Sequence, residues 1–347
     1  MARAATVPPA AVVGVDGLDL HDGTVMKAGS TYYMYGTMYG CGFHWGQAGT
    51  PWCGFGVSTS PSLSGPWTKP VQLFSPASMN SYDKLTWQQT CSSGGAGCFN
   101  PRMVQRTWGP ADKVNILWFN APGDYARTGA NAYYVMGCNG PAGPCGETAG
   151  PPYGSLRKPP MYKCYGNGDF SIVTRGTDPA YIVCTMADQT LSIEQLDYSG
   201  TSGNGVGASN LAGLKNVESP GAYFDTASGK WIMTYSDPNC GYCAGDGTSY
   251  ATATSLTGPW TAPANTGYSA DPRARRAISA SSCGGQPRTA FVVDNQPYQY
   301  IDLWGIWNGD ASNQAGASSL FASLTYMPQP GANGKMLPPQ FAQWPCP

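Results

Sequence analysis

The stretch 216–260 constrains the fold more than any other part of the chain. It begins with a turn, Glu218-Ser219-Pro220, and contains strand-like runs such as 230–236 (KWIMTYS) and 249–255 (SYATATS). Runs rich in aromatic and β-branched residues, bounded by Gly, Pro and Ser, predict short antiparallel strands. Four such strands make one blade of a β-propeller. A carboxylate just before the innermost strand would then lie at the mouth of the central channel.

The phrase that closes this unit occurs twice in the chain. It reads SLTGPW at 255–260 and SLSGPW at 62–67, where it follows the strand-like residues STS. A repeated phrase of strand and turn indicates repeated structural units. The sequence therefore predicts a propeller of several blades and not an isolated hairpin.

Composition agrees with an all-β fold. Among 347 residues, charged residues are 11% and aromatic residues 12%, with 46 Gly and 30 Pro, and no run of a dozen residues shows helical periodicity. No shift in composition marks a linker, so we expect one domain over 1–347, with 1–13 as an N-terminal extension. The net charge of −1 without a basic run argues against nucleic acid and against electrostatic attachment to a membrane. No apolar stretch is long enough to span a bilayer.

Twelve cysteines lie mostly in Gly-rich loops. Disulfides explain them better than zinc, because the chain has only two histidines and its C-x-x-C pair has no second one. We therefore predict a secreted protein, and the start MARAATVPPAAVV reads as a mature N-terminus whose signal peptide has been removed. Pairing cysteines that are near in sequence gives 41–53, 91–98, 138–145, 164–184, 240–243 and 283–346, the last tying the C-terminus to the fifth blade.

Two turns carry a resemblance to a known family. The Glu218-Ser219-Pro220 turn and its closing phrase resemble glycoside hydrolase family 43 and related five-bladed propellers, in which E-[AS]-P opens the fourth blade and its Glu is the general acid. The segment His21-Asp22-Gly23-Thr24, followed by G-S-T-Y-Y, resembles the first-blade H-D-P-S motif, whose Asp is the general base. The resemblance implies a five-bladed β-propeller with Glu218 as acid and Asp22 as base, and it places His21 at the substrate. From the residues alone, Asp22 could instead cap a turn.

A third turn departs from the family. The run FNPRMV at 99–104 resembles a turn whose acidic residue adjusts the pKa of the acid or binds substrate, but Asn100 occupies that position. A neutral amide cannot raise a neighbour's pKa by charge repulsion, although it can bind a sugar hydroxyl. We expect Asn100 and Arg102 to contact substrate. Asp188, in an A-D-Q-T turn, is an alternative third carboxylate, although such a residue is usually structural.

Other candidates line the predicted channel mouth. Trp45, in the loop between Cys41 and Cys53, could stack on sugar rings or fill a gap between blades. An exo-galactanase branch near this family has a Gln that assists the water nucleophile, and Gln286 could correspond to it. Trp304 and Trp307 stand at the end of a predicted strand, where they could pack in the core or form a wall of the substrate site. Typical family members have a His in blade five near a bound ion, and this sequence lacks it. We expect no required cofactor, and the sequence gives no support for or against a structural calcium ion in the central channel.

The expected function is that of a secreted, monomeric, inverting glycoside hydrolase. Its substrate would be a cell-wall polysaccharide or oligosaccharide with galactan, arabinofuranoside or galactofuranoside linkages. Inversion needs two carboxyl groups about 6.5–9.5 Å apart with a water between them, an arrangement that Asp22 and Glu218 could form across the channel. The alternative is a carbohydrate-binding propeller that has lost catalysis, for which Asn100 would be the sign. A structural propeller scaffold would explain the fold but not the polar turns.

Overall fold

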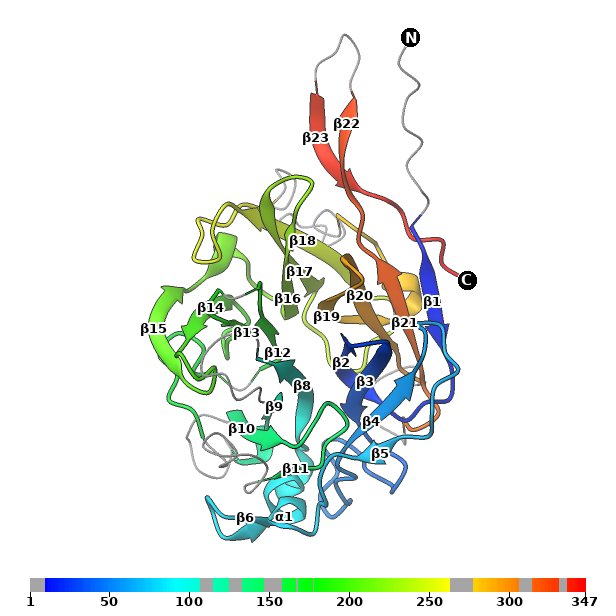
Figure 1. Ribbon diagram of the computed structural model, residues 1–347, viewed down its shortest axis with the longest axis vertical. Helices are drawn as coiled ribbons and strands as arrows, with labels where there is room; N and C mark the ends of the chain where they lie inside the picture. Colours follow the sequence, from blue (N-terminus) through cyan, green and yellow to red (C-terminus); the bar gives the residue numbers. More distant parts are fainter. Residues whose placement is uncertain are drawn as a thin grey trace.

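Five antiparallel sheets surround a common centre in the computed structural model (Figure 1). The structure describes residues 10–106, 115–124, 133–146, 158–166, 168–176, 178–262, 277–305, 314–330 and 336–347, without the side chains of 327–330 and 336–340. The predicted all-β fold with five blades is confirmed.

Within each blade the strands run from the centre outward in sequence order. Blade one contains β2 (His21–Ala28), β3 (Thr31–Thr37), β4 (Phe55–Ser60) and β5 (Val71–Gln72). Blade two contains β8 (Phe99–Gln105), β9 (Asn115–Asn120), β10 (Tyr133–Cys138) and β11 (Cys145–Gly146). Blade three contains β12 (Phe170–Val173), β13 (Tyr181–Thr185), β14 (Leu191–Leu196) and β15 (Gly203–Ala208).

The last two blades differ from this pattern. Blade four has β16 (Glu218–Asp225), β17 (Lys230–Asp237) and β18 (Gly247–Ala253), so its sheet has three strands over the described residues where we expected four. Blade five has β19 (Gln286–Val293), β20 (Gln296–Leu303) and β21 (Ser318–Ser323). Its outermost strand is β1 (Val12–Val15) from the other end of the chain, with Val12 opposite Ala322. This pairing corrects the predicted extension 1–13, because its last two residues belong to the propeller; residues 1–9 lie outside the described part.

Short elements decorate the blades. They are β6 (Met79–Asn80), β7 (Leu85–Thr86), α1 (Trp87–Cys91) and the 3-10 turns Ser93–Gly95, Leu211–Gly213 and Ser282–Gly284. A two-stranded ribbon of β22 (Tyr326–Pro330) and β23 (Met336–Phe341) extends beyond the rim of the disc (Figure 1). The two closing phrases form the same turn, with φ of 91° at Gly65 and 92° at Gly258, a conformation that favours glycine. The repeat in the sequence is therefore a repeat in structure.

The hydrophobic core is divided into layers between neighbouring blades. Alternate residues of a strand face opposite neighbours, so Phe119 packs with Phe55 of blade one while Trp118 packs with Phe170 of blade three. Equivalent clusters join blades three and four, four and five, and five and one. Because apolar side chains fill these layers, the centre is free to be polar.

Four innermost strands begin with an irregularity in register. The breaks fall between His21 and Thr24, Phe99 and Arg102, Glu218 and Gly221, and Pro287 and Ala290. Such bulges re-aim side chains next to active sites. Inside the first three, Asp22, Asn100 and Ser219 have φ of 53°, 57° and 53°. A Cβ on Gly23 would lie 1.6 Å from the Tyr35 carbonyl oxygen, so close backbone approach explains why glycine stands there where the family motif has proline.

All six predicted disulfides form, and no cysteine is free. The pairs are Cys41–Cys53, Cys91–Cys98, Cys138–Cys145, Cys164–Cys184, Cys240–Cys243 and Cys283–Cys346. The last links the start of blade five to the C-terminal segment, as expected. Together with β1, it fastens both ends of the chain to the same blade.

Removing the Cys283–Cys346 disulfide should destabilise the protein more than removing Cys41–Cys53. The cysteines of the Cys283–Cys346 disulfide are 63 residues apart in the sequence, and those of Cys41–Cys53 are 12 apart. The disulfide that closes the longer loop restricts the unfolded chain more. With both cysteines of a pair replaced by Ala, we expect the free energy of unfolding in urea to fall by about 1.5 kcal/mol more for the Cys283–Cys346 variant. Equal losses, or a larger loss for Cys41–Cys53, would contradict this.

Candidate active site

One cavity of about 200 Å³ opens at the ends of the innermost strands. Its polar lining comes from all five blades, and one side of it is aromatic. The polar residues are Asp22, Asn120, Asp169, Glu218, Gln286 and Arg288, and the aromatic ones are Tyr39, Trp45, Phe99, Tyr242 and Trp304. The cavity is smaller than the roughly 300–1,000 Å³ of sites that enclose drug-sized ligands, a size that suits a single sugar ring.

Glu218 stands at the start of β16 and is held on one carboxylate oxygen. Its Oε1 accepts hydrogen bonds from the backbone N–H of Cys240 at 3.0 Å and from Nε2 of Gln286 at 2.6 Å. Burial, and then the negative charge of Asp169, raise the pKa of Glu218 to about 7, against the opposing charge of Arg288. A carboxyl group that keeps its proton near neutral pH is suited to general acid catalysis.

Asp169 is the third carboxylate of the site, and it is not among the residues predicted from the sequence. It precedes β12 and accepts hydrogen bonds from Nδ2 of Asn100 at 2.8 Å and from the Ser219 hydroxyl, while Nη1 of Arg288 lies 3.1 Å from it. Burial alone would raise the pKa of Asp169, but Arg288 and these hydrogen bonds hold it below the usual value. Asp169 therefore stays ionised beside Glu218.

The third carboxylate was expected in the blade-two turn, where Asn100 stands, or at Asp188. The structure places it at Asp169 instead. Asp188 is exposed in its turn, where its side chain accepts from the Thr190 hydroxyl at 2.7 Å. A usable signal was present: Asp169 directly precedes the apolar run FSIV, as a polar residue opens the innermost strand of other blades. The run is short and follows a Gly-rich segment, and it was not identified as a strand.

Asp22 faces the same cavity from blade one. Its carboxylate accepts hydrogen bonds from Oγ1 of Thr37 at 2.8 Å and from the backbone N–H of Asn100 at 3.2 Å. Burial raises the pKa of Asp22 to about 7; the charge of Arg288 opposes the shift and that of Asp302 adds to it. Above that pH the carboxylate can accept a proton, which is the requirement for a general base.

Arg288, which is not among the residues predicted from the sequence, connects these groups. Besides Asp169, its guanidinium contacts the Asn100 side-chain oxygen through Nη2 at 3.1 Å, and its Nε lies 3.9 Å from Asp302. Burial lowers its pKa, but the surrounding carboxylates outweigh burial and raise it above the ordinary value. The sequence did contain an indication that Arg288 belongs to the site: the triplet Gln286-Pro287-Arg288 has the same pattern as Asn100-Pro101-Arg102 in blade two. Arg288 supplies positive charge among the inner carboxylates.

Three residues expected to contact substrate lie behind the cavity instead. Arg102 is buried and donates to the Asp22 carbonyl oxygen at 2.6 Å and to the Phe170 carbonyl oxygen at 2.9 Å. His21 is buried, with Nδ1 3.3 Å from Asp302. Neither residue lines the cavity, and the Arg102 guanidinium and Nδ1 of His21 face other protein groups.

Asn100 is the third of these residues, and it is a hub of the network. Its side-chain oxygen accepts from Arg102 and Arg288, each at 3.1 Å, while its nitrogen donates to Asn120 and Asp169. An amide can do both at once, whereas an ionised carboxylate only accepts. Asn100 is fully buried and its side chain is satisfied by protein, so a positioning role replaces the predicted sugar contact.

The aromatic side of the cavity includes Trp45, which is 45% exposed and lies 5.6 Å from the ring of Tyr242. Trp304 is buried and donates through Nε1 to Oε1 of Gln286 at 2.6 Å. Gln286 is thus held by Trp304, Glu218 and the Cys240 carbonyl oxygen. Trp45, Gln286 and Trp304 all line the cavity, whereas Trp307 lies outside the described residues.

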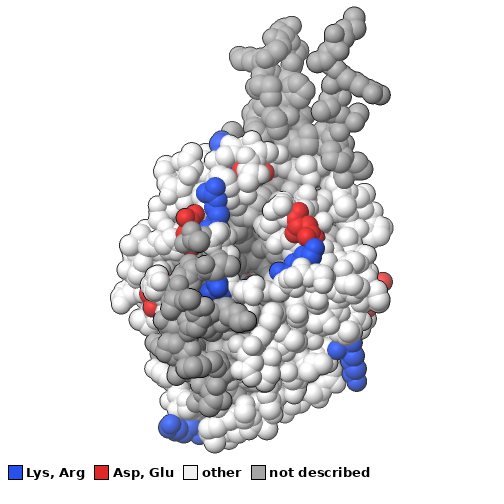
Figure 2. All heavy atoms as spheres, in the orientation of Figure 1, with Lys and Arg blue, Asp and Glu red and all other residues white. Residues whose placement is uncertain are grey.

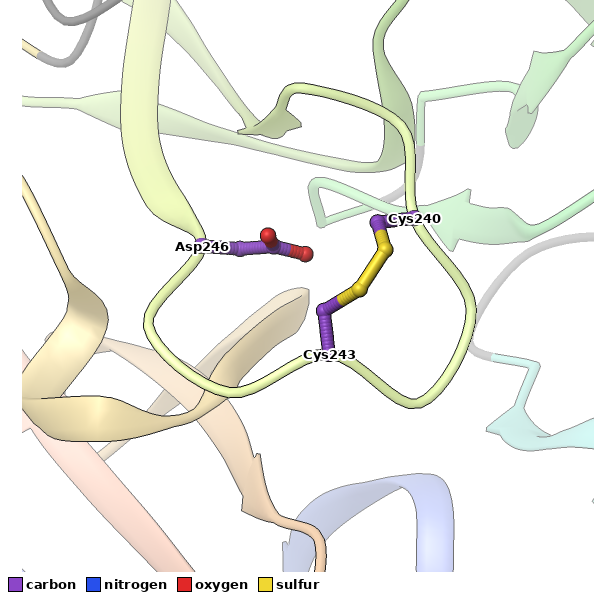
Figure 3. Close-up of side chains that lie close together, drawn as sticks. All are labelled: Cys240, Cys243 and Asp246. Carbon is purple, nitrogen blue, oxygen red and sulfur yellow. A yellow bond between two sulfur atoms is a disulfide. The ribbon is translucent and has the colours of Figure 1, made fainter. Parts of the chain in front are cut away.

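One group of potential metal ligands adjoins the site. Cys240, Cys243 and Asp246 bring donor atoms within 4.8 Å of one another, and the Asp246 side chain points toward the two sulfur atoms (Figure 3). The sulfur atoms are bonded to each other, and a disulfide offers no thiolate to a metal ion. The Cys240–Cys243 disulfide is therefore better described as a cross-link that closes the loop beside Glu218.

The face shown in Figure 2 carries few charged side chains, and both signs are scattered over it. Over the described residues no helix is long and apolar enough to cross a membrane. Charged residues are only 11% of the chain and its net charge is −1, a balance that suits a neutral ligand better than a polyanion.

No protein-family profile matches the chain, and no curated protein sequence matches it significantly. Solved structures do resemble it. An exo-β-1,3-galactanase from Phanerochaete chrysosporium, determined with β-1,3-galactotriose, superimposes with a TM-score of 0.62 at 18% identity, over 96% of this chain and 67% of that one. A putative exo-β-1,3-galactanase from Bifidobacterium bifidum gives 0.60 at 15% identity, over 93% and 91%.

A structure described as a GH43 β-1,3-galactosidase gives a TM-score of 0.63 at 17% identity, over 88% of this chain. This chain spans 57% of the length of that one. At such identities these likenesses establish the fold, which is that of the five-bladed propellers of glycoside hydrolase family 43. They confirm the fold that the two sequence motifs implied.

Replacing Asp169 with Asn should lower the pKa of Glu218, because a neighbouring negative charge is removed while Arg288 keeps its positive one. The glutamates of this chain are Glu147, Glu194 and Glu218, so ¹³C-glutamate labelling gives a spectrum simple enough to titrate by NMR. Asp188→Asn is the matched control, since it removes a solvent-screened charge and should leave the titration unchanged. An unchanged or higher pKa of Glu218 in Asp169→Asn would rule out the proposed electrostatic coupling.

Proposed function

We propose that this protein is a secreted glycoside hydrolase that cleaves galactan-type linkages with inversion of configuration. The observation that carries the proposal is the convergence of Asp22, Asp169 and Glu218, from three blades, on one small cavity with an aromatic side. A purely sugar-binding propeller has no use for two carboxyl groups whose pKa values are raised toward neutrality. The six disulfides and the absence of free cysteines support an extracellular location.

In this proposal Glu218 protonates the departing glycosidic oxygen and Asp22 removes a proton from the attacking water. Asp169 keeps the pKa of Glu218 high enough for the acid to hold its proton. Gln286 orients the Glu218 carboxyl group through its 2.6 Å hydrogen bond. Oxygen protonation and water attack then occur on opposite faces of the sugar ring, as inversion requires.

The substrate class rests on fold likeness together with the site. The neighbours in the structural comparison are described as β-1,3-galactanases and galactosidases, so β-1,3-linked galactan is the first substrate to test. Arabinofuranosides and galactofuranosides complete the panel, and ¹H NMR of the newly released anomer reads the stereochemistry. Cleavage of no member of the panel would favour a non-catalytic carbohydrate-binding propeller.

The two carboxyl groups should respond differently to the leaving group. Glu218→Gln should lower kcat on β-1,3-galactan by about 10²–10⁴-fold, because general acid catalysis is lost. The loss should be smaller on substrates whose activated leaving groups need little protonation. Asp22→Asn should slow both substrate types alike, since water must attack in either case.

These rates also distinguish the two candidates for activating water. If Asp22→Asn keeps near-parent turnover while Gln286→Ala abolishes it, Gln286 steers the water and the base assignment is wrong. If all three variants match the parent, the active site lies elsewhere.

The pH dependence follows from the two raised pKa values. Asp22 must be ionised, so kcat/KM should fall as the pH drops below its pKa of about 7. Glu218 must be protonated, so kcat/KM should also fall as the pH rises above its pKa of about 7. We expect a narrow bell centred near neutral pH. A plateau that extends well into the alkaline range would contradict the assignment of Glu218 as the acid.

A further inference from the structure

The loop between β17 and β18 touches the candidate acid through its backbone. The N–H of Cys240 donates to Oε1 of Glu218 at 3.0 Å, and the carbonyl oxygen of Cys240 accepts from Nε2 of Gln286 at 2.5 Å. One residue thus fixes both side chains. The Cys240–Cys243 disulfide closes this loop around Gly241 and Tyr242 (Figure 3).

Tyr242 has a backbone conformation that non-glycine residues seldom adopt, with φ of 56°. Its hydroxyl lies 2.8 Å from that of Tyr39, and its ring centroid lies 4.7 Å from that of Trp304 and 5.6 Å from that of Trp45. Backbone strain that surrounding contacts enforce is typical of ligand clamps. The ring lines the same cavity as Glu218.

The position of the acid determines which part of a substrate meets this ring. A general acid must be within hydrogen-bond reach of the leaving oxygen, so the leaving-group sugar lies on the Glu218 side of the cavity. The loop that holds Glu218 also carries Tyr242, and Trp45 continues the same surface outward to solvent. Aromatic rings of this kind present apolar faces to the C–H faces of a sugar.

We propose that Tyr242 and Trp45 form the subsite for the leaving-group sugar, and that the Cys240–Cys243 disulfide holds this subsite in register with Glu218. The ligand class is an uncharged sugar ring with an apolar C–H face. The inference rests on the proposed function and deepens it. Tyr242 and Trp45 contact substrate, while Cys240 is a positioning residue that acts through Glu218.

The subsite is tested with two substrates of one enzyme preparation. β-1,3-Galactobiose places a sugar in the leaving-group position, whereas β-galactosyl fluoride leaves that position empty. Tyr242→Ala and Trp45→Ala should each lower kcat/KM on the disaccharide about 3- to 10-fold more than on the fluoride, the range expected for lost ring contacts. Tyr242→Phe keeps the ring and should show no such difference, and Tyr198→Ala, at a 70% exposed side chain, is the surface control.

Equal losses on the two substrates would overturn the subsite, because a residue that only supports the cavity wall affects both alike. Glu218→Gln separates this failure from that of the proposed function. If Glu218→Gln abolishes cleavage of the disaccharide while the aromatic variants show no difference, only the subsite is wrong. If Glu218→Gln remains fully active, the proposed function fails as well.

The role of the disulfide has its own readout in the pH profile. A hydrogen bond from the Cys240 N–H favours the ionised form of Glu218, so loosening the loop should raise the pKa of Glu218. In Cys240→Ser/Cys243→Ser the alkaline limb of kcat/KM should therefore move to higher pH. Cys138→Ser/Cys145→Ser, which opens a short disulfide in blade two, should leave the limb in place. An unmoved limb in folded Cys240→Ser/Cys243→Ser would overturn the positioning role.

Discussion

The buried guanidinium of Arg288 is the interaction on which the centre of this propeller depends. Innermost strands from different blades bring carboxylates together where little water can screen them, and such charges are costly to bury unless they are paired. The Arg288 guanidinium lies 3.1 Å from Asp169 through Nη1 and 3.9 Å from Asp302 through Nε, and it donates to Asn100 through Nη2. A lysine side chain has one nitrogen and could not place three nitrogens in this way. The planar fork of arginine meets several partners in fixed directions, whereas the ammonium group of lysine acts as a point charge. Without this cation the inner strands would bring like charges together.

The same cation separates the properties of the carboxyl groups. Asp169 is in direct contact with it and stays ionised. Glu218 is held instead by neutral donors, the Cys240 N–H and the Gln286 amide. Burial and the nearby Asp169 charge therefore dominate at Glu218, and its pKa rises. Two carboxyl groups in one cavity thus acquire opposite tendencies from their partners, which is how one site can hold an acid and a fixed anion at the same pH.

Local motifs made part of this site predictable from the sequence. The turns at Asp22 and Glu218 could be placed because each consists of contiguous residues with a strand pattern behind them, and the disulfides because each of five pairs closes a short loop. Asp169 and Arg288 could not be placed with the same ease, since each owes its role to residues of other blades. For Asn100 the turn was predicted correctly, but the role of the side chain was not. Its hydrogen-bond partners are distant in the sequence, so a buried residue that connects them was interpreted as a sugar contact.

The strained positions of the backbone show how the fold and the site are coupled. Asp22, Asn100, Ser219 and Tyr242 all have positive φ, and each lies at or directly behind the cavity. Local conformational preference is violated where long-range contacts can enforce it, here because apolar layers between blades fix the innermost strands from both sides. A loop on a less rigid scaffold would relax toward ordinary dihedral angles and release the carboxylates. The division of the molecule into five apolar layers around a polar centre is therefore the condition that keeps Glu218, Asp169 and Asp22 in one cavity.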